Sequence, residues 1–367
     1  MKIEEIELRT IHLPLVRPFR TSFGTQTSRE VLIVKVTNEN GTVGWAECVA
    51  MSEPLYSPEY VVGCIDLIKR FLIPALKAKS EIDAEDVATV LKPFLAGQMA
   101  KASLETAILD AQLKDKKVSF ASYLGATKSK VECGVSVGIA NNLEALGDEV
   151  KFYVDAGYRR IKLKIEPGWD IEAVKYIRNL YPDIQLQVDA NQAYSRKDGK
   201  HLAQLDEFNL LLIEQPLDEH DILGHALLAK EVKTAICLDE SIISLQSAED
   251  ALALKATTII NIKPGRVGGY LESVKIHDHC LKNKIPVWCG GMLETGIGRA
   301  ANLALAALPG FTLPGDTSAS ARYFKQDITT PFVMENGYLT VPNKPGIGVE
   351  PDMDFLESIT KSKEIIV

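Results

Sequence analysis

The sequence lacks the features that mark membrane, secreted and nucleic-acid-binding proteins. It begins Met1-Lys2-Ile3-Glu4-Glu5, without the apolar core of a signal peptide, and no stretch approaches the roughly 18 apolar residues of a membrane span. A net charge of −8 disfavours a nucleic-acid or anionic-membrane partner. We therefore expect a cytoplasmic protein that has no membrane partner and no nucleic-acid partner.

Cysteine metal motifs and low-complexity tracts are also missing. The six cysteines lie far apart without a CxxC pair, which in a chain of 367 residues indicates reduced core thiols. A zinc site is therefore not expected. The glycine-rich run at 265–269 lacks the spacing of a dinucleotide-binding loop, so it predicts a strand-to-helix turn instead.

The first part of the chain has the pattern of a small α+β domain. Three extended runs, at 3–14, 31–37 and 42–49, are followed by helical stretches. Asn40-Gly41 predicts a tight hairpin between the last two runs. We assign this domain to residues 1–125. The final segment, 321–367, contains a hairpin pattern around Asn336-Gly337, and we expect it to pack back onto the N-terminal domain.

Between residues 126 and 320, strand and helix patterns alternate. An open doubly wound sheet is one interpretation, but residues from five neighbouring strands could not all meet at its switch point. A (β/α)8 barrel of the α/β class fits the number and spacing of the strands better. The predicted strands are 131–139, 160–165, 184–190, 210–214, 235–239, 258–263, 286–289 and 310–314.

Five charged residues end consecutive predicted strands at intervals of 24 or 25 residues. Because barrel active sites lie at the carboxyl ends of the strands, the five should form one site. Three of them are neighbouring acids, whose mutual repulsion in a buried site a hard divalent cation would relieve. Oxygen ligands favour Mg²⁺ or Mn²⁺, whereas simple helix capping is the alternative role. The five are Lys164, Asp189, Glu214, Asp239 and Lys263.

Lysines stand on both sides of the acids. Lys164 and Lys263 belong to strands four apart, which places them on opposite walls of a barrel. Lys162 points to the same face as Lys164, and a like charge that close favours a neutral base near pH 7; a solvated edge strand is the alternative. The arrangement suits abstraction of the proton α to a carboxylate held by a metal ion. We therefore expect a small-molecule carboxylate as substrate.

Six motifs carry a family resemblance over essentially the whole chain. The chain resembles the enolase superfamily, its muconate-lactonising subgroup, and most of all the o-succinylbenzoate synthase / N-acylamino acid (N-succinylamino acid) racemase family. The motifs are Lys162-Leu163-Lys164, Asp189-Ala190-Asn191, Ile213-Glu214-Gln215-Pro216, Leu238-Asp239-Glu240-Ser241, Asn261-Ile262-Lys263-Pro264 and Trp288-Cys289-Gly290-Gly291-Met292-Leu293-Glu294.

The resemblance implies a modified barrel of the (β/α)7β type whose mouth is capped by the N-terminal domain. Lys164 and Lys263 would be the acid/base pair, with Lys162 beside them; enolase-superfamily sites pair such a base with Mg²⁺. The Mg²⁺ ligands would be Asp189, Glu214 and Asp239, supported by Asn191 and Glu240. Substrate contacts would come from the barrel at Ser136, Gly291, Met292 and Leu293, and from the cap at Ser22, Met51 and Tyr56.

Several activities use this chemistry. The resemblance implies dehydration to o-succinylbenzoate for menaquinone biosynthesis, together with racemisation of N-succinylamino acids, in a homo-oligomer. A dedicated racemase, a cycloisomerase of the muconate-lactonising type and a catalytically silent binding barrel are the alternatives. A mandelate-racemase-type site is disfavoured because His277 and His279 fall in a predicted helix. A dipeptide epimerase is disfavoured because strand eight offers only Asp316.

Arg266 bears on the choice between dehydration and racemisation. A guanidinium three residues after Lys263 would lower the pKa of that lysine and favour the neutral base. Racemisation needs both lysines to exchange protons, whereas dehydration leaves Lys263 as a passive cation. Arg266 therefore favours racemase competence and a place at the substrate. A surface pairing with an acid is the alternative.

Overall fold

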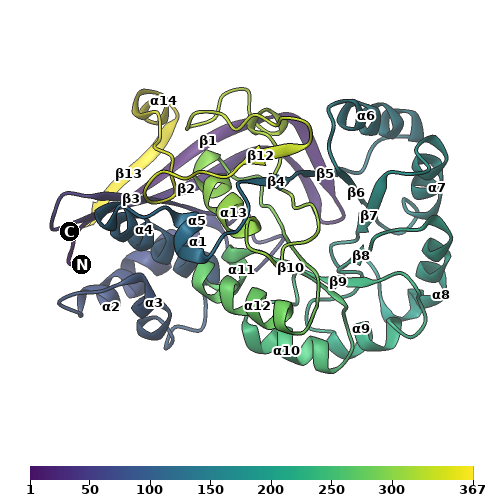
Figure 1. Cartoon of the computed structure of the whole chain (residues 1–367), viewed down its shortest axis with the longest axis horizontal. Helices are drawn as coiled ribbons and strands as arrows, with labels where there is room; N and C mark the ends of the chain where they lie inside the picture. The colour runs from purple at the N-terminus through teal and green to yellow at the C-terminus, as the bar shows by residue number, and fades with distance from the viewer. Residues whose placement is uncertain (367) are drawn as a thin grey trace.

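The computed structural model describes residues 1–366 and contains an antiparallel sheet beside a curled parallel sheet (Figure 1). The antiparallel sheet confirms the three predicted N-terminal runs, and the Asn40-Gly41 turn connects the last two strands, with Gly41 at a φ of +78°. The sheet order is β13-β1-β2-β3. The strands are β1 Ile3–Thr21, β2 Gly24–Asn38, β3 Val43–Cys48 and β13 Thr360–Ile366.

Helices follow these strands along the chain, as the sequence predicts. The longest, α4, packs against β3 so closely that a Cβ on Gly44 would lie 1.9 Å from the Ala107 carbonyl oxygen. Glycine at this position therefore allows the helix to lie on the strand. The helices are α1 Val61–Leu67, η1 Ile68–Leu72, α2 Ile73–Lys77, α3 Ala84–Val90, α4 Gln98–Lys116 and α5 Phe120–Leu124.

The parallel sheet confirms seven of the eight predicted barrel strands. Each strand pairs in parallel with the next one along the chain, so all carboxyl ends lie at the same edge. Almost every residue in these strands is buried, as expected for strands covered on both faces. They are β5 Gly134–Val137, β6 Arg160–Lys164, β7 Gln185–Asp189, β8 Ile213–Glu214, β9 Ile236–Leu238, β10 Ile259–Ile262 and β11 Val287–Cys289.

Helices lie between these strands and form an arc outside them (Figure 1). Their apolar faces pack on the sheet, which is why the strands are inaccessible from outside. The helices are α6 Leu143–Asp155, α7 Ile171–Leu180, η2 Arg196–Asp198, α8 Gly199–Leu202, η3 Ala203–Phe208, α9 Ile222–Leu228, α10 Leu245–Ala253, α11 Pro264–Val267, α12 Tyr270–Lys282 and α13 Gly296–Ala306. None of the helices within residues 1–366 has the length and apolar character to cross a membrane.

The prediction of an eighth strand at 310–314 was wrong. Within the described chain this segment makes a single bridge, from Phe311 to Val287 of β11, and the next residue, Gly315, makes another to Cys133 just before β5. Pro314 has no N–H to donate, so a continuous ladder cannot form there. The Arg160 side chain instead donates to the Pro314 carbonyl at 2.9 Å. The segment closes the barrel without being a strand.

The C-terminal residues contact both parts of the chain. The predicted turn at Asn336-Gly337 forms, with both residues at positive φ, and it precedes β12 Tyr338–Thr340, which pairs with β4 Lys130–Glu132. Further on, β13 pairs antiparallel with β1 in the N-terminal sheet. The remaining elements are η4 Ser320–Arg322 and α14 Met353–Ser358.

All six cysteines are buried, and none within the described chain forms a disulfide. One buried acid, Glu105 of α4, joins the N-terminal helices to the barrel. Its Oε1 accepts the Leu271 N–H at 3.1 Å, at the first turn of α12, and burial raises its pKa to about 8. Glu105 is therefore a titratable group placed where the two parts of the chain meet.

The raised pKa of Glu105 predicts a pH-dependent effect of removing its charge. Because the folded chain holds this proton more tightly than the unfolded chain, its contribution to stability falls as pH rises from about 4.5 to 8. Glu105→Gln should therefore gain thermal stability relative to the parent chain across that range in a Tm series. Glu172→Gln, on the exposed face of α7, is the control. A pH-independent difference for Glu105→Gln would contradict this account.

Candidate active site

The five residues of the predicted site meet at the carboxyl edge of the parallel sheet. Lys164, Asp189 and Glu214 are the last residues of β6, β7 and β8. Asp239 and Lys263 directly follow β9 and β10. All five side chains are buried. The parallel register places Lys164 opposite Asp189 and Asp189 opposite Glu214, so the intervals in the sequence become contacts in space.

The two outer lysines are each held by an acid. Lys164 Nζ donates to Asp189 Oδ2 at 2.6 Å and to Asn191 Oδ1 at 2.5 Å. Lys263 Nζ donates to Asp239 Oδ2 at 2.7 Å and to the Tyr56 hydroxyl at 2.8 Å. Each lysine is thus oriented by a carboxylate and by a neutral oxygen. Tyr56 brings the N-terminal domain into direct contact with the barrel site.

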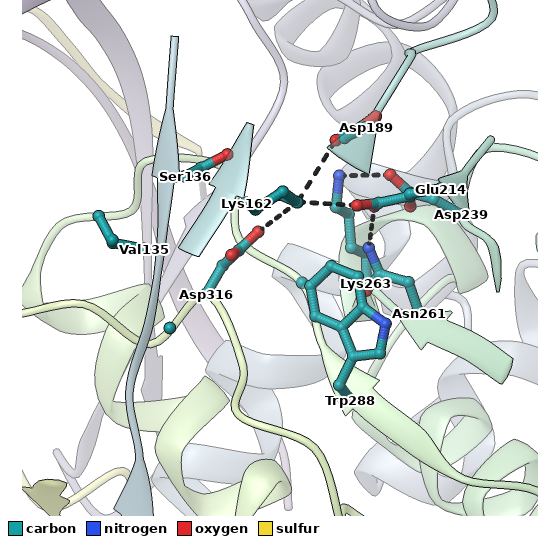
Figure 2. A network of polar contacts seen from close by, with 12 residues as sticks. Val135, Ser136, Lys162, Asp189, Glu214, Asp239, Asn261, Lys263, Trp288 and Asp316 are labelled. Carbon is teal, nitrogen blue, oxygen red and sulfur yellow. Dashed lines mark hydrogen bonds and ion pairs between the residues drawn. The ribbon is translucent and has the colours of Figure 1, made fainter. Parts of the chain in front are cut away.

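Lys162 lies at the centre of a network of acids (Figure 2). Its Nζ is 2.9 Å from Glu214 Oε2, 2.8 Å from Asp316 Oδ2 and 3.3 Å from Asp189 Oδ2. Burial disfavours its charge, but these carboxylates outweigh burial and raise its pKa. The edge-strand interpretation was wrong, because Lys162 is only 2% exposed. The Lys162 charge neutralises these three acids. The predicted role was different, because it used Lys162 as a like charge beside Lys164.

Asp316 is a member of this network that sequence reasoning did not place there. It accepts hydrogen bonds from Arg160 Nη2 at 2.9 Å and from Lys162, and these cations outweigh burial and hold its pKa below its usual range. Lys162 and Arg160 also lie over the Trp288 ring, at 4.7 and 5.1 Å from its centroid. The only signal in the sequence was a lone acid following the predicted eighth strand.

Arg266 does not have the predicted effect on Lys263. Its Nη2 donates to Glu219 Oε2 at 2.9 Å and to the Glu240 carbonyl. Arg266 therefore pairs with an acid, as the alternative interpretation held, but the pair lies in a buried position and not at the surface. Burial disfavours the Lys263 charge, but Asp239 outweighs it and raises the pKa of Lys263. The predicted lowering was therefore wrong for this arrangement.

Side chains behind the acids fix their orientation. Asn191 Nδ2 donates to Glu240 Oε1 at 2.8 Å, which brings together the two predicted supporting residues. Asn261 Nδ2 donates to Glu214 Oε1 at 2.8 Å, a contact that the sequence did not predict. Gln215 adopts a positive φ of 36° and accepts the Asp239 N–H at 3.0 Å. The turns after β7 and β8 are thus held by side-chain hydrogen bonds.

The donor set suits a hard cation, although its oxygens now face lysines. The three acids offer only oxygen, and within residues 1–366 the buried Asp239 Oδ1 has no hydrogen-bond partner. Burial and the neighbouring Asp189 raise the pKa of Glu214 well above its usual range, a penalty that a cation would remove. In the described chain no three His, Cys, Asp or Glu side chains converge on one metal position as they stand, and the oxygens of the three acids accept hydrogen bonds from Lys162, Lys164 and Lys263 instead.

A cavity of ≈ 40 Å³ is lined by both Lys164 and Lys263, and its walls include part of the predicted substrate site. Met51, Tyr56, Gly291, Met292 and Leu293 line it as predicted. Gln26 and Arg29, which belong to none of the predicted motifs, also line the cavity. The full lining adds Phe19, Thr21, Phe23 and Asn191.

Three predicted substrate contacts lie elsewhere: Ser22, Ser136 and Arg266 do not line this cavity. The Ser22 hydroxyl donates to the Ala190 carbonyl at 3.1 Å, so it joins the N-terminal domain to the turn after β7. Ser136 Oγ is buried and has no hydrogen-bond partner within residues 1–366. The Met292 N–H already donates to Glu294 Oε1 at 2.7 Å, so it is not free for a substrate oxygen.

Comparison with known proteins accounts for both parts of this structure. Residues 5–125 match the family model of the mandelate racemase / muconate lactonizing enzyme N-terminal domain, and residues 145–355 match the enolase C-terminal domain-like model. The chain belongs to the enolase superfamily. The family resemblance that the motifs predicted is confirmed.

Relatives of this enolase-superfamily member cover the full chain. An N-succinylamino acid racemase from Amycolatopsis sp is 55% identical over 99% of both chains. The o-succinylbenzoate synthase of Bacillus subtilis is 45% identical over 100% of this chain and 98% of its own. A solved enolase-superfamily structure from Listeria innocua matches with a TM-score of 0.95 and 43% identity, over 100% of this chain and 99% of its own. Both activities therefore occur in the family.

Because Lys162 and Asp316 form a buried ion pair, removing one partner should lower the unfolding free energy strongly. Asp316→Asn leaves the buried Lys162 and Arg160 with too little negative charge, which typically costs about 3–5 kcal/mol of unfolding free energy. Urea unfolding of the parent chain and the variant measures this difference. Asp155→Asn, which breaks the exposed pair with Lys151, should cost under about 1 kcal/mol. Equal costs at the two positions would rule out the proposed balance of charge.

Proposed function

We propose that this protein forms o-succinylbenzoate by dehydration and also racemises N-succinylamino acids, in both cases by removing the proton α to a carboxylate. The observation that carries the proposal is that Lys164 and Lys263 border one cavity, with the three acids on the strands between them. Relatives with both names match the whole chain at 45% and 55% identity. The reaction class of the first activity is carbon–oxygen lyase and that of the second is isomerase.

Lys164 would remove the α-proton in dehydration. The same lysine would then donate that proton to the leaving hydroxyl group, which departs as water, while Lys263 stays protonated. In racemisation one lysine would take the proton from one face of the α-carbon, and the other would return a proton to the opposite face. Lys164 at the end of β6 and Lys263 just after β10 suit this division, because strands four apart in the sheet bring the two lysines to the cavity from different walls.

Asp189, Glu214 and Asp239 would hold Mg²⁺ or Mn²⁺, with Asn191 and Glu240 supporting them. When bound, the ion would stabilise the negative charge that develops on the substrate carboxylate as the α-proton leaves. The buried Asp239 Oδ1, which has no partner among the residues that the structure describes, and the oxygen-only donor set support this assignment. Lys162 would remain a fixed counter-charge between Glu214 and Asp316.

The domain boundaries are part of the proposal. Residues 1–125 would cap the barrel of 126–320, and 321–367 would return to the cap. The first boundary is supported by the family model that ends at 125, and the return by the pairing of β13 with β1. A small-molecule carboxylate would be the substrate, in a cytoplasmic homo-oligomer.

Replacing Lys164 and Lys263 separately should show which proton transfer each lysine carries out. Lys164→Ala should abolish dehydration and racemisation, because it removes the base, and circular dichroism should show an intact fold. Lys263→Ala should lose racemisation but still exchange the α-proton of one enantiomer in D₂O, followed by NMR. Turnover by Lys164→Ala would overturn the assignment of the base. Exchange of both enantiomers by Lys263→Ala would overturn the two-lysine scheme.

Metal removal tests the role of the acids. Chelation should abolish kcat/KM both for the dehydration substrate and for a panel of N-succinylamino acids, and added Mg²⁺ should restore it. The ratio of the two kcat/KM values decides between a synthase and a dedicated racemase. Formation of a lactone would instead identify a cycloisomerase. Full activity after chelation would exclude a metal-dependent site, and inactivity toward every substrate with Mg²⁺ would favour the silent barrel.

A further inference from the structure

Glu294 ends the Trp288–Glu294 motif and has no role in the mechanism above. It is 4% exposed, and its Oε1 accepts both the Met292 N–H at 2.7 Å and the Asn302 side-chain amide at 3.0 Å. A Cβ on Gly291 would lie 3.4 Å from Glu294 Oε2. The carboxylate therefore folds back along the Gly291–Met292 backbone, which is the barrel wall of the substrate cavity.

This wall has a backbone that needs support. Leu293 has a φ of +57°, a left-handed conformation that costs a residue with a Cβ about 1 kcal/mol or more. The conformation is held from both sides, because the Glu294 side chain fixes the Met292 N–H and Arg299 Nη2 donates to the Glu294 carbonyl at 2.7 Å. The wall is therefore set by contacts behind it.

The N-terminal domain reaches the same place. Glu47 of β3 accepts the Thr295 N–H at 2.9 Å and the Thr295 hydroxyl at 2.7 Å, directly beside Glu294 in the sequence. Burial, and then the charge of Glu294, raise the pKa of Glu47 to about 7. Arg29 of β2 partly offsets this and donates to the Val49 carbonyl at 3.3 Å, just before Met51 of the cavity. The cap thus meets the barrel wall through buried charges.

A second cavity lies beside these groups. It has a volume of ≈ 30 Å³, enough for about two water molecules, and both carboxylates line it. Glu47 Oε1 is buried there and has no hydrogen-bond partner within the described chain. Lys263 and Met292 line both this cavity and the substrate cavity. The wall between the two spaces is therefore thin, and its position depends on Glu294.

We propose that Glu294 is a positioning residue that fixes the Gly291–Leu293 wall of the substrate cavity, and that Glu47 of the cap holds it in place from behind. The cap and the barrel together then hold the wall in one conformation, which is the conformation that a substrate contacts. The consequence for turnover rests on the proposed function. The consequence for the Met292 amide rests on the contacts alone.

The test compares Glu294→Ala with Glu294→Gln in the full chain. Hydrogen–deuterium exchange of the peptide that contains Met292 should accelerate in Glu294→Ala, because the acceptor of its N–H is gone. KM for an N-succinylamino acid should rise about tenfold with kcat changed less than about threefold, the pattern of lost binding. Glu294→Gln keeps an oxygen for the Met292 N–H and should recover both quantities. If the alanine variant does not fold, Glu294→Asp replaces it, because the shorter side chain cannot bring its carboxylate to the Met292 N–H.

Glu105→Ala is the matched control, since it also removes a buried carboxylate where the cap meets the barrel. It should lower Tm and leave both KM and the Met292 exchange rate unchanged. Unchanged exchange and KM in Glu294→Ala would overturn the proposal, as would an equal KM rise in Glu105→Ala. If the parent chain turned over no substrate, the proposed function would fail, and the exchange experiment would still decide whether Glu294 positions the wall.

Discussion

The structure depends on how buried like charges are compensated at the carboxyl edge of the parallel sheet. Asp189 and Glu214 are adjacent in register and inaccessible to water, so each raises the cost of ionising the other. Lys162 lies between them and binds Asp316 as well. Lys164 binds Asp189 and Lys263 binds Asp239, so ammonium groups compensate the acids in this structure, as a divalent cation bound among them would.

Closure of the barrel follows from the same interaction. The segment before Asp316 has too few backbone hydrogen bonds to form a strand, so side chains from β6 hold it instead. Arg160 binds the Pro314 carbonyl and the Asp316 carboxylate, while Lys162 connects that carboxylate to the centre of the site. Arg160 and Lys162 thus connect the irregular side of the barrel to the acids of the site, so the stability of this side depends on the charges of the site.

The sequence predicted the fold and the five central residues because regular spacing in parallel strands becomes adjacency. It could not predict partners that depend on side-chain direction. Lys162 has a lysine two residues away in sequence but acids around it in space. Arg266 follows Lys263 but pairs with Glu219, which comes from a different strand end. Ser136 is buried but does not line the substrate cavity, while Arg29 of β2 lines it from a part of the chain that is remote in sequence from the barrel strands.

The central claim is that the substrate lies between the two outer lysines, with its carboxylate among the three acids. A crystal structure with Mg²⁺ and an N-succinylamino acid tests it directly. The account predicts the α-carbon between Lys164 Nζ and Lys263 Nζ, and one metal ion coordinated by Asp189, Glu214, Asp239 and the substrate carboxylate. A substrate whose α-carbon contacts neither lysine, or a metal ion held by other residues, would contradict it.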